Sequence, residues 1–118
     1  MIQGFRDLEV YQRAYRTSLD IHKLSMNFPK TEQYELGAQV RRATKSIAMN
    51  IAEGFGKRGS VSEFKRYLHI ALGSCAEVHV QLDYCRDLEY INAEQYELYR
   101  REYNVIGKQL ITMIRKWQ

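Results

Sequence analysis

The fold of this chain is decided by residues 60–85, which read SVSEFKRYLHIALGSCAEVHVQLDYC. Apolar and small residues recur there at alternating steps of four and three, the spacing of a helix that packs lengthwise against its neighbours. Ser60 and Glu63 precede this row at the spacing of a capping box, so the helix should begin just after Ser60. The seam consists of Phe64, Leu68, Ala71, Cys75, Val78, Leu82 and Cys85.

Three other stretches carry the same spacing and predict three further helices. The first should start at the N-cap Asp7 and stop just before Pro29, because proline disfavours helical geometry in the residue before it. The second should start at the N-cap Thr31 and end at Gly54 and Gly56. The three seams are Val10, Ala14, Thr17, Ile21, Leu24 and Phe28; Leu36, Val40, Ala43, Ile47, Ile51 and Gly54; and Tyr96, Tyr99, Tyr103, Ile106, Leu110, Met113 and Trp117.

Composition and link lengths predict one domain over residues 1–118. The 118 residues are 45% hydrophobic and 27% charged, as in an ordinary globular protein, and include a single proline. With Asn92 as the N-cap of the last helix, the links are short, at about residues 28–31, 55–60 and 89–92. Short links between long helices force antiparallel neighbours. The predicted fold class is therefore all-α, an antiparallel up-down-up-down four-helix bundle.

Several classes of protein are disfavoured. No apolar run approaches the ~20 residues of a membrane-spanning helix, and the N-terminus lacks the layout of a signal peptide, so we expect a cytoplasmic protein with no membrane contact. The glycine and serine patterns of P-loops, dinucleotide sites and nucleophile elbows are missing. Cys75 and His79 could face one metal, but a buried thiol beside a boundary histidine is the favoured interpretation. We predict no catalytic residues, no metal and no cofactor.

Charge is distributed in blocks along the chain. Residues 41–66 carry seven bases against two acids, residues 67–99 one base against six acids, and residues 100–118 five bases against one acid. In the predicted topology the start of the first helix, the link near residue 58 and the end of the fourth helix share one end. That end should be basic, the other acidic, and a basic surface suits nucleic-acid phosphates. The predicted contact residues are Lys57, Arg58, Lys65, Arg66, Arg115 and Lys116.

Residues 54–60, GFGKRGS, admit two interpretations. Glycines, two bases and a following helix N-terminus together can hold a phosphate. The same residues also serve simply to stop one helix and start the next, and this is favoured over a dedicated small-ligand site because Walker spacing is missing. As part of a broad phosphate-contacting surface, the link remains a candidate.

Two helices carry a second stripe beside the apolar seam. On the first helix it contains Leu8, Tyr11, Tyr15 and His22, which a neighbouring helix or a second copy of the chain could cover. On the second helix it is polar. That stripe is either a solvated flank or a hydrogen-bonding strip against another helix or another subunit, and the second interpretation is preferred. The polar strip comprises Gln39, Arg42, Ser46, Asn50 and Glu53.

Several motifs together resemble a known family. They are residues 5–14 (FRDLEVYQRA), 28–29 (FP), 39–43 (QVRRA), 50–54 (NIAEG) and 70–74 (IALGS), and they extend over nearly the whole chain. The chain resembles the bacterial four-helix-bundle proteins encoded in intervening sequences of 23S ribosomal RNA genes. That family is similar to the accessory variability determinant proteins of diversity-generating retroelements.

The resemblance implies copies that assemble into a ring, with a pentamer favoured, and a basic surface that binds RNA or DNA. In retroelement members it implies a reverse transcriptase partner, and it implies no enzymatic activity. The leading hypothesis is therefore a non-catalytic, oligomeric nucleic-acid-binding accessory protein. The alternative is a structural homo-oligomeric scaffold that binds a protein partner and has no nucleic-acid role. A metal-dependent enzyme is the least favoured hypothesis.

Overall fold

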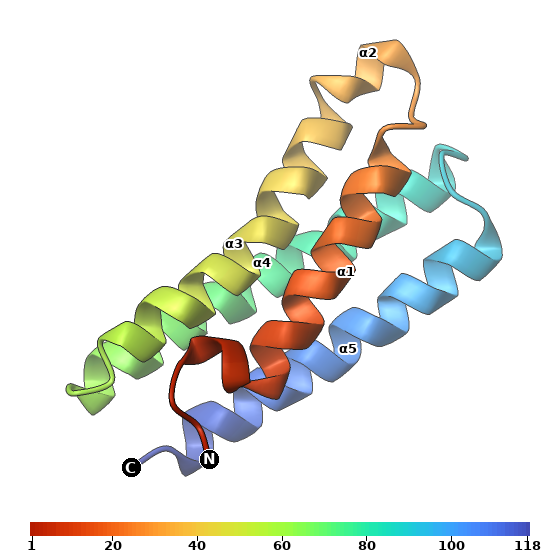
Figure 1. Ribbon diagram of the computed structural model, residues 1–118. Coiled ribbons are helices and arrows are strands. Elements are labelled where there is room, and N and C mark those ends of the chain that lie inside the picture. Colours follow the sequence, from red (N-terminus) through yellow and green to blue (C-terminus); the bar gives the residue numbers. More distant parts are fainter.

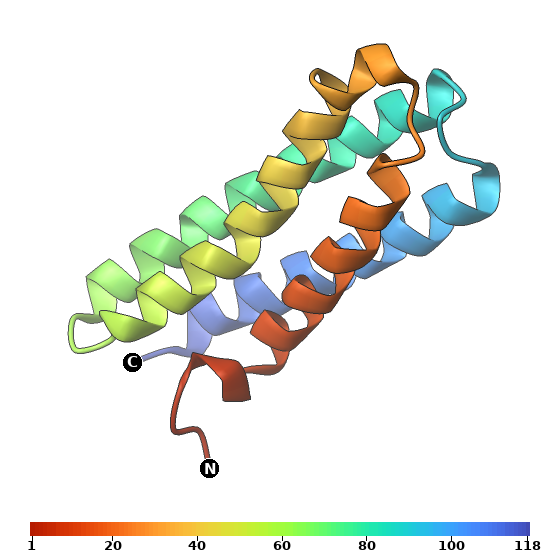
Figure 2. The same ribbon diagram turned by 45° about the horizontal axis from the view of Figure 1, so that its top comes forward.

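The computed structural model describes all 118 residues and contains four long helices. These are α1 (Glu9–Ser25), α3 (Leu36–Gly56), α4 (Val61–Asp87) and α5 (Ala93–Lys116), with a 3-10 turn η1 (Phe5–Asp7) before α1 and a single helical turn α2 (Lys30–Gln33) before α3. The long helices run up-down-up-down in a bundle of 44 × 23 × 22 Å (Figure 1, Figure 2). The predicted four-helix bundle is confirmed.

The core lies along the predicted seams. Every seam residue of α3 and α4 is buried, and those of α1 are buried except Leu24, which is half-buried. On α5 only the middle of the seam is fully buried, at Tyr103, Ile106 and Leu110, while its two ends are half-buried. The α3–α4 pair is therefore the most completely packed part of the bundle, and α5 covers one side of it.

The predicted start of α1 is wrong. The N-cap of α1 is Leu8, which makes no side-chain cap. The Asp7 carboxylate instead accepts hydrogen bonds from the backbone amides of Gln3 at 2.8 Å and Gly4 at 3.2 Å, so it closes the turn before the helix. These two amides hold the pKa of the Asp7 carboxyl below its usual range. Asp7 therefore caps the N-terminal turn η1 and not the helix α1.

The predicted cap at Thr31 is also wrong, because the chain forms a separate turn, α2, before α3 begins at Leu36. Two side chains, Gln33 and Arg41, hold this corner, and the Gln33 amide donates to the carbonyls of Ser25 at 2.9 Å and Phe28 at 2.8 Å. Arg41 reaches further. Its guanidinium donates to the Gln33 carbonyl at 2.6 Å and to the Ser25 hydroxyl at 2.9 Å, and so joins α1, α2 and α3. Sequence reasoning counted Arg41 only as a charge, since its partners lie 8 and 16 residues away.

The other two predicted N-caps are observed. The Ser60 hydroxyl accepts from the Glu63 amide at 3.3 Å, and the Asn92 side chain accepts from the Gln95 amide at 2.8 Å. Only the Asn92 cap is reciprocal, because the Gln95 side chain returns to the Asn92 amide at 2.9 Å. At Ser60 the expected capping box is half-formed, since the Glu63 carboxylate binds Arg66.

Gly54 sets the distance between α3 and α4. It does not end α3, which continues to Gly56, and no glycine in the chain has a positive φ. Gly54 is buried, and a Cβ atom placed on it would lie 2.6 Å from the Tyr67 Cβ and 3.2 Å from the Phe64 Cδ1. The two helices approach this closely because Gly54 has no side chain.

We expect Gly54→Ala to destabilise the fold by about 1–3 kcal/mol, because the added methyl overpacks a contact made with the stem of Tyr67. Gly73→Ala is the matched control. Gly73 lies inside α4 with no atom near its missing Cβ, so alanine there should be neutral or stabilising by roughly 0.5–1 kcal/mol. Urea unfolding followed by circular dichroism measures both, and equal midpoints for the two variants would contradict the close-approach role.

Candidate nucleic-acid interface

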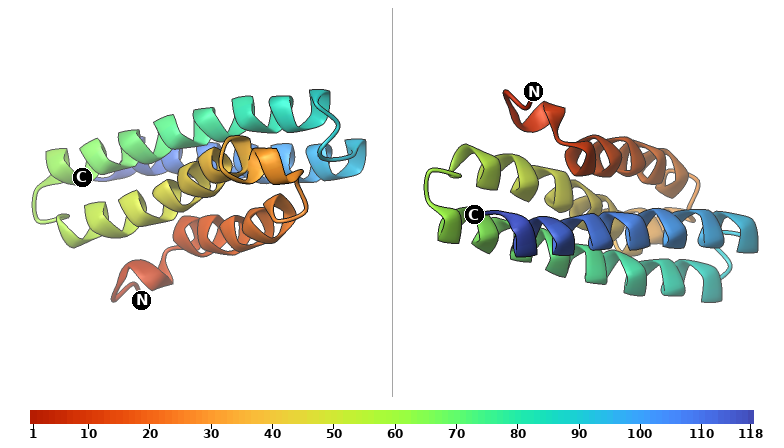
Figure 3. Two further views of the ribbon diagram at one scale, coloured as in Figure 1. Left: turned by 90° about the horizontal axis from the view of Figure 1, so that it is seen from above. Right: turned by 90° about the horizontal axis from the view of Figure 1, so that it is seen from below.

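Three segments that are distant in sequence meet at one end of the bundle. Figure 3 shows the N-terminus, the link between α3 and α4, and the C-terminal end of α5 at this end. The topology therefore gathers the six predicted phosphate contacts, and we call them the basic end. They are Lys57, Arg58, Lys65, Arg66, Arg115 and Lys116.

A cluster of three aromatic rings supports this end. The rings of Phe55 and Phe64 meet edge to face at a centroid distance of 5.9 Å, and Trp117 packs edge-on against Phe64 at 4.7 Å. Phe55 is 3% and Phe64 0% exposed. Since Trp117 follows α5, the cluster joins the end of α5 to the α3–α4 link and fixes the two groups of cations relative to each other.

Three of the cations lie on aromatic rings. The Arg58 guanidinium stands 4.0 Å from the Phe55 ring centre and also donates to the Phe55 carbonyl at 2.9 Å. Lys57 and Arg66 lie 5.0 and 4.5 Å from the ring centre of Tyr67. The Lys57 ammonium donates to the Tyr67 hydroxyl at 3.0 Å, and this contact raises the pKa of Lys57. Such cation–π contacts hold the charged groups in place while they remain exposed.

Nearby carboxylates neutralise part of the basic end. Glu63 accepts from Arg66 at 2.9 and 3.2 Å, which raises the pKa of Arg66 and lowers the pKa of Glu63. Glu53 lies 4.0 Å from Lys57. Cations of the basic end with no acidic partner within 4.0 Å are Arg58, Lys65, Arg115 and Lys116.

The α3–α4 link uses its own backbone groups to connect the two helices. The amides of Lys57, Arg58 and Ser60 donate to the carbonyls of Gly54, Phe55 and Lys57 respectively. The Ser60 hydroxyl caps α4. These bonds agree with the interpretation of the link as a helix stop and start, and its side chains are what it offers to a phosphate surface.

The structure divides the predicted polar strip. Its centre joins α3 to α4, because the Ser46 and Ser74 hydroxyls lie 2.9 Å apart and the Asn50 amide donates to the Ser46 carbonyl at 2.8 Å. Arg42 makes no hydrogen bond or ion pair within the chain, and Glu53 faces Lys57 and not Asn50. The remaining member of the strip, exposed on α3, is Gln39.

Beside this strip lies a hollow with polar walls, and one buried polar atom near it has no hydrogen-bond partner. A hollow of about 310 Å³ opens between α3 and α4. The buried Gln81 side-chain oxygen has no hydrogen-bond partner. The polar residues that line the hollow are Gln39, Arg42, Ser46, Ser74, Glu77 and Gln81.

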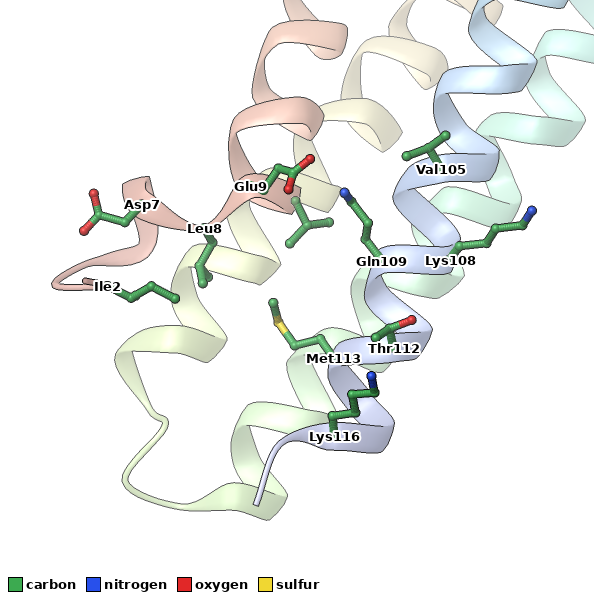
Figure 4. Close-up of a pocket in the computed structure, with 11 residues that line it drawn as sticks. Ile2, Asp7, Leu8, Glu9, Val105, Lys108, Gln109, Thr112, Met113 and Lys116 are labelled. Atoms are coloured by element: carbon green, nitrogen blue, oxygen red, sulfur yellow. The ribbon is translucent and has the colours of Figure 1, made fainter.

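A second groove separates α1 from α5 next to the basic end. Figure 4 shows residues that line its hollow of about 570 Å³, with Leu8 and Met113 at its base and Lys108 and Lys116 projecting from α5. Further along, the Arg13 guanidinium bridges the helices to Glu102 at 2.9 Å. This is the one side-chain hydrogen bond or ion pair that joins α1 to α5, and these two helices contact each other less extensively than α1 contacts α3 or α4 contacts α5.

Large apolar side chains remain exposed on two faces. In the groove between α1 and α3, Tyr15 is 48%, Leu19 45% and Met49 67% exposed. On the outer side of α4, Val80 is 55% and Tyr84 58% exposed. The second stripe of α1 is thus only partly covered within one chain, since Leu8 is buried while Tyr11 and His22 are half-buried.

The thiols and histidines form no metal-binding group. Cys75 is 2% exposed, and burial raises its pKa to about 11. Its Sγ donates to the Tyr103 carbonyl at 3.3 Å. No three His, Cys, Asp or Glu side chains gather where they could hold a metal ion. No helix combines the length and the apolar character needed to cross a membrane.

These features define a four-helix bundle with one basic end. The chain belongs to the 23S rRNA-intervening sequence protein family, whose model matches residues 6–112. It is similar to a crystal structure of a protein of unknown function from the S23 ribosomal protein family of Bacteroides thetaiotaomicron VPI-5482. That similarity has a TM-score of 0.80 and 28% identity, and it covers 91% of this chain and 99% of the other. No protein of curated function matches the chain.

Sequence reasoning placed the basic cations at one end but missed their aromatic supports. The signal was present in the sequence, because Arg58 follows Phe55 by three residues and Tyr67 follows Arg66 directly. It could not be assigned without knowing that Lys57 reaches across the link to Tyr67.

We expect Glu63→Gln to strengthen the binding of a polyanion at the basic end, because it releases Arg66 from its carboxylate partner. One more free cation should steepen the log–log salt dependence by about 0.7–0.9. Fluorescence anisotropy with a labelled RNA duplex between 50 and 200 mM salt measures it. Glu94→Gln, at the opposite end of the bundle, makes the same change in net charge and should have no effect. Equal strengthening by both variants would assign the effect to net charge alone.

Proposed function

We propose that this protein is a non-catalytic, oligomeric nucleic-acid-binding accessory protein that contacts phosphates through its basic end. The observation that carries the proposal is the convergence of six cations from the α3–α4 link, the first turns of α4 and the last turn of α5. Lysine and arginine side chains that neutralise phosphates release condensed counterions, and this release drives binding without sequence recognition.

The aromatic residues at this end favour contact with the backbone of the nucleic acid. Nucleobases stack on open aromatic faces in proteins that bind single strands. Here Phe55, Phe64 and Tyr67 are buried and already packed against other rings or against cations. Base stacking should therefore be limited and sequence preference weak.

RNA and DNA share the phosphate chemistry that this surface would recognise. The name of the family points to RNA, and to the cytoplasm as the place of action, since its members are described as 23S rRNA-intervening sequence proteins. The resemblance to retroelement accessory proteins adds a reverse transcriptase as a candidate protein partner. Genomic position, inside a ribosomal RNA gene or beside a reverse transcriptase gene, separates these two settings.

Assembly into a ring, with five copies favoured, is part of the proposal. Apolar side chains exposed on the α1–α3 face and on α4 support contact between copies, because large exposed apolar patches commonly mark interaction sites. Rotation of one subunit onto the next would then repeat the basic end around one rim. The same apolar faces also support the alternative, a structural scaffold that binds a protein partner.

We expect size exclusion with light scattering to give a mass near five times the 14.0 kDa of one chain. A Tyr15→Glu/Met49→Glu variant should reduce this mass and leave the helical circular dichroism unchanged, because both side chains are exposed in the single chain. A parent protein that runs as a monomer at micromolar concentration would contradict the assembly.

We expect reversal of four cations, Lys57, Arg58, Lys65 and Arg66 to Glu, to abolish binding to labelled RNA and DNA, while the bundle stays folded because all four lie outside the seams. The parent should lose affinity with salt at a log–log slope of about −0.7 to −0.9 per phosphate neutralised. Lys23→Glu/Lys30→Glu at the acidic end should bind almost as the parent does. If the parent protein binds neither RNA nor DNA at about 50 mM salt, the basic end only keeps the protein in solution, and the alternative of a structural scaffold is favoured.

A further inference from the structure

The outer face of α5 carries a row of cations beyond the basic end. Arg101, Lys108 and Arg115 are all exposed and follow one another at intervals of seven residues. Seven residues complete nearly two helical turns, with a drift of only ~20°, so the three side chains share one face of the helix. At 1.5 Å rise per residue the row is about 21 Å long.

Acidic side chains do not neutralise this row. The only cation of α5 in an ion pair within 4.0 Å is Arg100, which binds Glu97 at 3.0 Å. The other acid in the middle of the helix, Glu102, is bound to Arg13 of α1 at 2.9 Å. Glu97 lies within one turn of both Arg100 and Arg101, and its two oxygens are engaged by Arg100. Arg101, Lys108 and Arg115 therefore form no ion pair within 4.0 Å, although Arg101 lies close enough to Glu97 to help lower the pKa of that carboxyl.

Helix stability accounts for only one of these three cations. A base in the last turn of a helix interacts favourably with the helix dipole, which suits Arg115. Arg101 and Lys108 lie in the third and fifth turns of α5, before its last turn, where this effect is lost. They also have no i±3 or i±4 acid that pairs with them, so no contact within the chain explains their placement.

The row is continuous with the basic end. Arg115 belongs to both, and Lys108 lies on the edge of the α1–α5 groove together with Lys116 of the basic end (Figure 4). Free cations therefore extend from the end of the bundle along its side.

We propose that the phosphate-binding surface is a track, in which Arg101 and Lys108 extend the basic end along α5, and that it binds an RNA or DNA duplex through its phosphates. This inference rests on the proposed function and names the form of nucleic acid that the surface takes. Phosphates along one strand of a duplex are spaced by about 3.4 Å along its axis, so a 21 Å row spans roughly six of them.

Two features of the track favour a duplex over a single strand. No aromatic residue occupies the exposed positions between Arg101 and Arg115, which hold Asn104, Lys108, Ile111 and Thr112. At the basic end Phe55, Phe64 and Tyr67 are buried and Trp117 is half-buried. Without fully exposed rings, a single strand loses most of the stacking contribution of about 1–3 kcal/mol per base. A duplex has a higher charge density than a single strand, so each phosphate contact releases more counterion. The slope of log affinity against log salt is about −0.9 per phosphate for a duplex and about −0.7 for a single strand.

The test compares Arg101→Gln/Lys108→Gln with Lys23→Gln/Lys30→Gln. Both double variants remove two positive charges from exposed surface positions, but Lys23 and Lys30 lie at the far end of the bundle. Anisotropy titrations use labelled 16-mers as duplex RNA, duplex DNA and single strands at 50–200 mM salt. We expect the Arg101/Lys108 variant to lower the magnitude of the duplex slope by about 1.8 and to weaken binding roughly tenfold per lost contact at 50 mM salt.

The matched control should keep the slope of the parent, and the parent should bind duplexes more tightly than single strands. The track is overturned if the Arg101/Lys108 variant keeps the slope of the parent, if the control weakens binding equally, or if single strands bind as tightly as duplexes. In each of these cases the basic end still binds and the proposed function stands. Both the track and the proposed function are overturned only if the parent protein binds none of the three probes. Melting temperatures equal to that of the parent show that the variants are folded.

Discussion

The close approach of α3 to α4 at Gly54 is the constraint on which the basic end depends. A side chain at this position would collide with the stem of Tyr67 and with the Phe64 ring. Because the helices can touch there, the link between them needs only four residues, 57–60, and Phe55 reaches Phe64 directly. The rings that hold Arg58 and the end of α5 are in place as a consequence. The packing of small and aromatic residues thus determines where the charges stand.

Much of the fold could be predicted from the sequence, because the heptad spacing is a repeated signal that survives local errors. Each seam residue of α3 and α4 is buried as expected. The starts of helices were less predictable, since any short polar side chain near a boundary can act as a cap. Asp7 and Thr31 fit the cap pattern, yet Asp7 closes the preceding turn and Thr31 lies within α2. Arg41 forms the corner beside α2 through partners far away in sequence, which no local pattern reveals.

The candidate site was predictable in position and not in detail. Topology alone brings the charged blocks of residues 41–66 and 100–118 to one end, so the six cations could be named. Which of them are free depends on side-chain pairing, and there the sequence interpretation treated Arg66 as equal to Lys65 although Glu63 holds Arg66. Arg101 and Lys108 were overlooked because a block of charge was counted as a property of one end, although α5 extends the full length of the bundle.

The ion pairs within helices share a short-range spacing that the sequence contains, but the spacing alone does not produce a pair, since Arg16 with Asp20 and Arg101 with Glu97 have it and form none. Residues three or four apart are neighbours on a helix, whereas residues two apart are not. Four cations, those at positions 13, 57, 66 and 100, have an acid at three or four residues and pair with it. Lys65 has an acid only two residues away and is free, and Lys108 has none within one turn. Charge that is neutralised locally contributes little attraction at a distance, so under the proposed function the cations outside ion pairs would decide where a polyanion binds. Six of the cations outside every ion pair lie on the proposed phosphate-binding surface, namely Arg58, Lys65, Arg115 and Lys116 at the basic end and Lys108 and Arg101 along α5. Others, such as Arg16, Arg42 and Lys45, lie elsewhere on the bundle.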